Sequence, residues 1–95
     1  MNATEAMEVT GPSGVATLEN IAAFYGPAVK ALEDVDRGAD GGATKYAERQ
    51  LKICDLRLSW YTEMYMKEPN KQNSGLVNTW RHLRGEAEEK ARDQA

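Results

Sequence analysis

A heptad-like apolar pattern between residues 43 and 67 is the feature that most constrains how this chain folds. Apolar residues recur there at alternating steps of four and three, which places them along one side of an α-helix. This heptad seam consists of Ala47, Leu51, Cys54, Leu58, Tyr61 and Tyr65. We therefore predict a helix from about Ala43 to Lys67, which ends because Pro69 disfavours helical geometry at Glu68.

A second apolar stripe lies about 120° around the same predicted helix, at a helical rotation of roughly 100° per residue. It consists of Tyr46, Ile53, Trp60 and Met64. The two stripes together form a broad apolar arc. We therefore expect this helix to contact two neighbouring helices rather than one.

Arg57 lies inside this apolar arc, one heptad after Gln50. Burial of an unpaired arginine is unfavourable, because its charge loses hydration. Two arrangements therefore remain open. The guanidinium reaches water while its stem packs, or an acid such as Glu33, Asp34 or Asp36 meets it.

An earlier amphipathic segment predicts a first helix that begins near Thr17, a suitable N-cap residue. Its apolar side consists of Leu18, Ile21, Tyr25, Ala28, Leu32 and Val35. Gly26 and Pro27 interrupt this segment, yet the apolar phase continues across them. We expect either one kinked helix of about 20 residues or two short helices sharing a face, at a helical period of about 3.6 residues.

A third amphipathic segment follows a short polar connection, and Asn73 or Ser74 can cap its start. Its apolar side consists of Leu76, Val77, Trp80, Leu83, Ala87 and Ala91. After Gly85 the pattern becomes mostly charged. The sequence places Glu86 four residues before Lys90 and Glu88 four residues before Arg92, which predicts two ion pairs along this helix.

These segments predict an all-α fold of three helices, in which a kinked first helix packs on a long antiparallel helical hairpin. A three-helix bundle and a helical hairpin packed into an oligomer both suit the two-stripe central helix. We divide the chain into a flexible N-terminal arm (1–16), a helical domain (17–85) and a charged C-terminal helical tail (86–95).

Composition argues against several kinds of protein. The chain has 95 residues and a formal net charge of −3, so it has no general attraction for phosphate or anionic lipid. The single cysteine, Cys54, cannot form an intramolecular disulfide and suits a reducing compartment. No secretion signal or membrane span is recognisable. We expect a cytoplasmic protein, or one within a particle assembled in the cytoplasm.

Catalysis has little support from the residue types present. Cys54 and His82 are the one cysteine and the one histidine of the chain. In a hairpin turning near residue 72, they lie roughly 12 Å apart along the helix axis, at 1.5 Å per residue. We predict no catalytic residues, no small-molecule substrate and no cofactor. The loop between Asp34 and Gly42 lacks the acidic residue that closes a calcium shell, so we also predict no metal site.

A basic and aromatic patch on the third helix allows an alternative function. Trp80 is followed by Arg81 and Arg84, which suits contact with phosphates and stacking on a base. The three glutamates that follow this patch argue against it. A nucleic-acid-associated accessory protein is therefore the alternative hypothesis.

The dense group of aromatic and long side chains near the end of the central helix favours protein binding, because such residues are enriched at interfaces. The predicted interface consists of Leu56, Arg57, Trp60, Tyr61, Met64 and Tyr65. We expect a non-catalytic assembly, adaptor or structural subunit with a protein partner or self-association, for example in a viral particle or a secretion or regulatory complex. A small inhibitor that masks a partner is a further alternative.

Overall fold

The computed structural model describes residues 1–11, 17–37 and 43–93, and over these ranges the protein is all-α, as predicted, with no strand. The described residues form four helices rather than the three that we predicted: α1 (Ala3–Glu8), α2 (Leu18–Arg37), α3 (Ala43–Lys67) and α4 (Lys71–Asp93). Residues 38–42, which belong to the loop considered for calcium, lie outside the described part of the chain.

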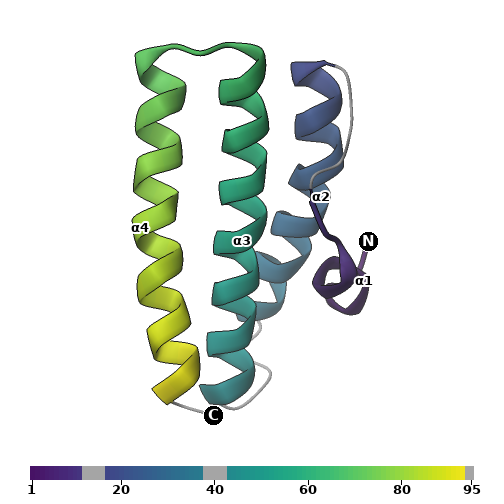
Figure 1. Ribbon diagram of the computed structural model, residues 1–95. Helices are drawn as coiled ribbons and strands as arrows, with labels where there is room; N and C mark the ends of the chain where they lie inside the picture. The colour runs from purple at the N-terminus through teal and green to yellow at the C-terminus, as the bar shows by residue number, and fades with distance from the viewer. Residues whose placement is uncertain (12–16, 38–42, 94–95) are drawn as a thin grey trace.

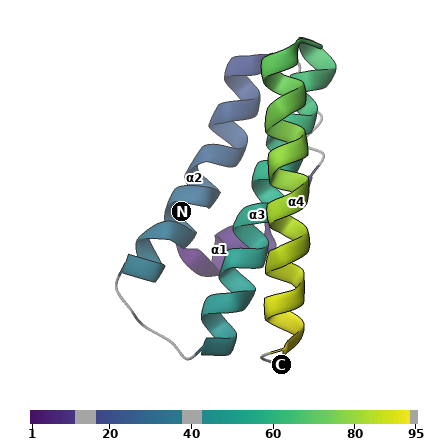
Figure 2. The ribbon, with the colours of Figure 1, turned by 90° about the vertical axis from the view of Figure 1, so that its left-hand side faces the viewer.

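The central element is α3, which lies between α2 and α4 and runs antiparallel to both (Figure 1). The side view shows α2 leaning away from α3 towards its own C-terminal end (Figure 2). The short helix α1 packs against α2, on the side of α3 away from α4. The helices thus form an elongated body with principal extents of 39 × 26 × 19 Å.

The bounds of α3 are those predicted from the heptad seam and from Pro69. The start of α4 differs from the prediction, because Asn70 caps it instead of Asn73 or Ser74. The Asn70 side chain accepts a hydrogen bond of 2.8 Å from the backbone N–H of Asn73. The buried Asn73 side chain in turn donates to the carbonyl oxygen of Glu68 at 2.9 Å. These two bonds join the end of α3 to the start of α4.

In α2, one continuous helix runs through Pro27 from Leu18 to Arg37. Thr17 caps this helix as predicted, since its hydroxyl oxygen accepts a hydrogen bond of 3.1 Å from the Asn20 N–H. Pro27 removes the hydrogen bond that the Ala23 carbonyl would otherwise accept. Both residues are exposed, so water can hydrate that carbonyl.

The helix α1 lies within the N-terminal arm (1–16), where we predicted no helix. A capping box begins it: the Asn2 side chain accepts from the Glu5 N–H at 2.9 Å, and the Glu5 carboxylate accepts from the Asn2 N–H. Ala6 has no exposed surface and belongs to the core. Contact with α2 therefore stabilises a helix that is too short to be stable alone.

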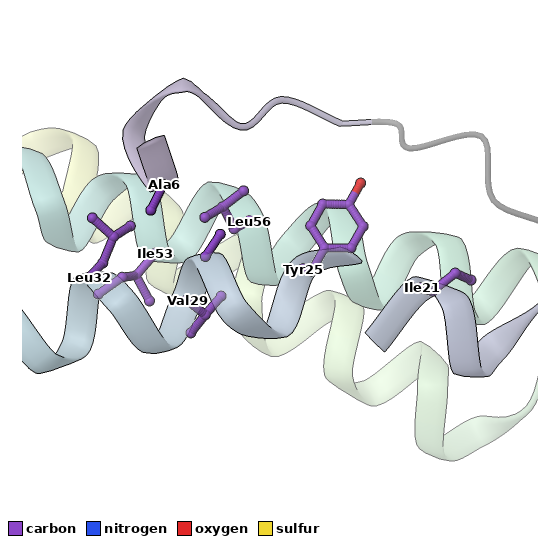
Figure 3. Close-up of a cluster of buried hydrophobic side chains, with 8 residues drawn as sticks. Ala6, Ile21, Tyr25, Val29, Leu32, Ile53 and Leu56 are labelled. Atoms are coloured by element: carbon purple, nitrogen blue, oxygen red, sulfur yellow. The ribbon is translucent and has the colours of Figure 1, made fainter. Parts of the chain in front are cut away.

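The main hydrophobic core lies where α1, α2 and α3 meet (Figure 3). Its buried members are Ala6, Ile21, Tyr25, Ala28, Val29, Leu32, Ile53 and Leu56. Ala6 and Leu32 lie at one end of this row of side chains and Ile21 at the other. No residue of α4 belongs to this cluster, so α4 depends on its separate contact with α3.

Candidate functional site

The contact between α3 and α4 is built largely from small side chains. On α3, Ala47 and Cys54 of the heptad seam are 5% and 8% exposed. On α4, the buried apolar residues are Val77 and Ala87, whereas Leu83 is only half-buried. Small residues allow the two helices to lie close, but they fill little space between them.

This arrangement leaves an apolar groove between the N-terminal half of α3 and the C-terminal half of α4. The groove has a cavity volume of about 320 Å³. We call this space the α3–α4 groove. It is lined by Tyr46, Ala47, Gln50, Cys54, Trp80, Leu83, Glu86, Ala87 and Lys90. The walls are mainly apolar, Gln50 is half-buried, and the charged residues Glu86 and Lys90 are exposed at the rim. This is a common composition for a binding site.

A ladder of aromatic rings crosses the three long helices. Tyr25 of α2 stacks with Trp60 of α3 at a centroid distance of 6.4 Å. Trp60 stacks with Tyr61 at 5.5 Å, and Tyr61 lies 6.2 Å from Trp80 of α4. Phe24 meets the edge of Tyr25 at 4.9 Å. Trp80 therefore ends the ladder and also lines the α3–α4 groove.

Arg57 lies within this ladder and joins it to α2. Its guanidinium carbon is 5.6 Å from the Trp60 centroid and 5.2 Å from the Trp80 centroid. Its Nη1 donates a hydrogen bond of 2.8 Å to the Tyr61 hydroxyl. Its Nη2 lies 3.8 Å from a Glu33 carboxylate oxygen, so of the two arrangements that the sequence left open, an acid of this segment meets Arg57. Both the ring faces and the carboxylate attract the positive charge of the guanidinium.

The predicted interface residues differ in how deeply the structure buries them. Leu56 is 2% exposed and belongs to the core, so it offers no surface to a partner. The sequence pattern placed Leu56 outside both apolar stripes. In the structure, Leu56 is buried because α1, α2 and α3 share one hydrophobic core, which covers a wider part of the α3 surface than the two stripes. Met64 is half-buried against the same core, whereas Tyr65 remains 39% exposed at the end of α3.

None of the six residues of the predicted protein interface lines the α3–α4 groove, and Trp80 of the basic and aromatic patch is the one predicted site residue that does. Tyr46, Gln50, Leu83 and Ala87 line it, although none belonged to the predicted interface. The available signal was the clustering of small residues at Ala47, Cys54 and Ala87 along two facing helices. Such a cluster indicates a helix pair that leaves space between its larger side chains.

The basic and aromatic patch on α4 takes part in contacts within the chain. Arg84 forms a hydrogen-bonded ion pair with Asp55 of α3, and its Nη1 bonds to Glu88 at 3.0 Å. The carboxylate of Asp55 raises the pKa of the Arg84 guanidinium. Trp80 belongs to the aromatic ladder, whereas Arg81 is exposed. Two members of the patch therefore have structural roles.

The acids of α4 pair one helical turn earlier than we predicted. Glu86 lies 2.6 Å from the His82 ring nitrogen Nε2, and Glu88 pairs with Arg84. Each of these partners lies four residues before the acid rather than four after it. Such exposed pairs differ little in free energy, so small differences in side-chain rotamers decide between them.

Cys54 lines the α3–α4 groove, together with Leu83, Ala87 and Lys90 of α4. The connection between α3 and α4 lies at residues 68–70, earlier than the turn near residue 72 that we assumed, so the predicted separation of Cys54 and His82 along the helix axis is wrong. Burial, followed by the neighbouring charge of Asp55, raises the pKa of the Cys54 thiol, while Arg84 and Arg57 oppose this shift. The protonated thiol is the form that lines the groove.

Within residues 1–11, 17–37 and 43–93, no three or more His, Cys, Asp or Glu side chains cluster in a way that would hold a metal ion. Over the same part of the chain, no helix combines the length and the apolar character that crossing a membrane requires.

The fold and the groove together define a small all-α protein with a partly open space between two of its helices. Comparison of the chain with protein-family models, with curated proteins and with solved structures finds no match.

Proposed function

We propose that this protein is a non-catalytic protein-binding subunit that holds a helix of its partner in the α3–α4 groove. In this proposal α3 and α4 act as an open helical hairpin, and α2 supports α3 from the other side. The observation that carries the proposal is the groove itself, which combines Trp80 and Leu83 with small apolar residues and a polar rim. A helix with an apolar stripe fits such a surface well.

The contacts around the groove support this function. The Trp80 ring contacts Tyr61 and Arg57, which hold it in place before a partner binds. Preorganised aromatic side chains lose little conformational entropy on binding. Tyr46 is 51% exposed at the rim and offers a second aromatic contact. Both residue types are enriched at binding hot spots.

Site-specific photo-crosslinking in the cells that express the protein tests the proposal. A photoreactive phenylalanine analogue replaces Leu83 in the groove in one variant. In the matched control it replaces Arg81, which is exposed and lies about 160° around α4 from Leu83, at 100° per residue. We expect a covalent protein adduct from position 83 and at least fivefold less from position 81.

Two results would contradict the proposal. If position 83 gives no adduct under conditions in which the variant is folded and abundant, the groove does not bind protein. If positions 81 and 83 give adducts in equal yield, the contacts are not specific to the groove. The mass of a specific adduct also reports the size of the partner.

A further inference from the structure

We infer that the N-terminal segment 1–9, which contains α1, is a strap that detaches while the three long helices stay folded, and that its release uncovers apolar surface at one end of the core. The strap lies on the side of α3 away from α4, so this inference concerns a different face from the α3–α4 groove and does not depend on the proposed function. Folded proteins commonly open such small peripheral elements without unfolding as a whole.

The hydrogen bonds of the strap are internal to it. The Asn2 side chain accepts from the Glu5 N–H, and the Glu5 carboxylate accepts from the Asn2 N–H. The backbone N–H groups of Ala6 and Val9 donate to the carbonyl oxygens of Asn2 and Ala6, at 3.0 and 3.3 Å. Among the residues that the structure describes, no hydrogen bond or ion pair joins the strap to a long helix. Its detachment therefore breaks no polar contact with the rest of the chain.

A small apolar contact holds the strap in place. Ala6 is the one buried residue of α1 and joins the core at the end where Leu32 lies (Figure 3). Ala3 and Val9 are partly buried against the same core. Met7 is 37% exposed and borders a shallow hollow of about 230 Å³ on the outer face of α3. The strap thus removes little apolar area from water, and its docking contributes correspondingly little free energy.

The long helices keep their own contacts when the strap leaves. Tyr25 of α2 stacks with Trp60 of α3, and its hydroxyl donates to Glu63. Gly11 approaches Tyr25 and Ser59 so closely that a Cβ atom would overlap the Tyr25 hydroxyl. The chain is thus held to α2 and α3 at Gly11, and the strap ends before that point. Opening of the strap is therefore separable from unfolding of the helices beneath it.

Amide hydrogen exchange of the full chain tests the inference, followed by NMR at several urea concentrations below the unfolding transition. The amides of Ala6 and Val9 report on the strap, and those of Ile53 and Leu56 report on α3. We expect the strap amides to exchange about a hundredfold faster or more, with a smaller urea dependence, because local opening exposes less surface than global unfolding. If both sets show the same free energy of opening and the same urea dependence, the strap opens only with the whole chain and the inference is wrong.

A charged substitution separates release of the strap from loss of the fold. Ala6→Asp places a carboxylate at the buried position of α1, which opposes docking. Thr4→Asp is the matched control, because it adds the same charge on an exposed position about 160° around the same helix, at 100° per residue. We expect Ala6→Asp to remove protection from the strap amides, to keep the helicity of the long helices by circular dichroism, and to raise the fluorescence of added anilinonaphthalene sulfonate about twofold or more. Thr4→Asp should do none of the three.

Two outcomes with these variants would overturn the inference. If Ala6→Asp unfolds α2 and α3 together with the strap, α1 is an integral part of the core. If the strap amides lose their protection but the dye fluorescence does not rise, its release uncovers no apolar surface.

Discussion

The guanidinium carbon of Arg57 lies 5.2 Å from the centroid of the Trp80 ring, and this contact joins the middle of α3 to the middle of α4. The same guanidinium approaches Trp60 and pairs with Glu33 of α2. Arg57 is 23% exposed in its side chain, so these contacts are partly shielded from water. One side chain of the central helix therefore contacts both of its long neighbours.

The first prediction concerns the stability that Arg57 provides. Arg57→Met retains much of the apolar stem but removes the charge, the hydrogen bond to Tyr61 and the contacts with the indole rings. We expect it to lower the free energy of unfolding by about 1–2 kcal/mol. Urea unfolding followed by circular dichroism measures this change. Arg81→Met, on an exposed part of α4, is the control and should change it by less than about 0.5 kcal/mol. Equal effects of the two substitutions would refute a stabilising role for Arg57.

The second prediction concerns Gly11, which lies three residues after the end of α1 at Glu8. A Cβ atom at this position would overlap the hydroxyl oxygen of Tyr25 and lie 3.0 Å from the Cβ of Ser59. Tyr25 has no exposed surface and its hydroxyl donates to Glu63, so the ring has little room to move. We expect Gly11→Ala to destabilise the protein by about 1–3 kcal/mol. Thermal unfolding measures the loss, and an unchanged midpoint would show that this close approach is absent in solution.

The third prediction uses a glycine with free space around it. Gly85 lies inside α4, is exposed, and has nothing within 4 Å of where a Cβ would lie. Glycine in a helix interior is less favourable than alanine because it loses more backbone entropy on folding. Gly85→Ala should therefore stabilise the protein by about 0.5–1 kcal/mol, in contrast to Gly11→Ala. A decrease in the urea midpoint would contradict the placement of Gly85 within a regular helix.

The fourth prediction concerns the dependence of stability on pH. The pKa of Cys54 is raised in the folded chain, chiefly by burial and then by Asp55. The unfolded chain therefore loses the thiol proton first, near pH 8.5. The raised pKa of Cys54 contributes to the free energy of unfolding. This contribution is fully present below that pH and is lost as the pH rises through the folded-state pKa.

Cys54→Ala removes this contribution without removing any other titrating group. The difference in unfolding free energy between the wild type and the variant should therefore shrink as the pH is raised from 7 to 10. Urea unfolding in the presence of a reducing agent measures it at each pH. If the difference in unfolding free energy stays constant with pH, the pKa of the Cys54 thiol is the same in the folded and the unfolded chain.

Local sequence signals predicted α3 and much of α2 correctly. The heptad seam and Pro69 define both ends of α3, because apolar periodicity and proline act within one or two helical turns. Thr17 caps α2 as expected. The apolar phase that continues across Pro27 corresponds to a single helix in the structure. These features depend on neighbours in sequence, and the amino-acid order is sufficient to specify them.

The helix α1 was missed because six residues give too short a pattern for periodicity to be visible. Its one buried residue is Ala6, and alanine alone does not mark an apolar face. The capping box of Asn2 and Glu5 was a local signal for a helix start. Whether a helix follows such a signal depends on a surface against which it can pack, and here α2 provides that surface.

The sequence by itself determined the all-α class and the bounds of the central helix, because these follow from local periodicity and from proline. It left open whether Arg57 reaches water or meets an acid. Only the tertiary structure decided that Leu56 is core, that α1 is a helix and that a groove opens between α3 and α4. Those outcomes depend on which helices meet and at what offset, and the many weak packing contacts that decide this join residues far apart in the chain.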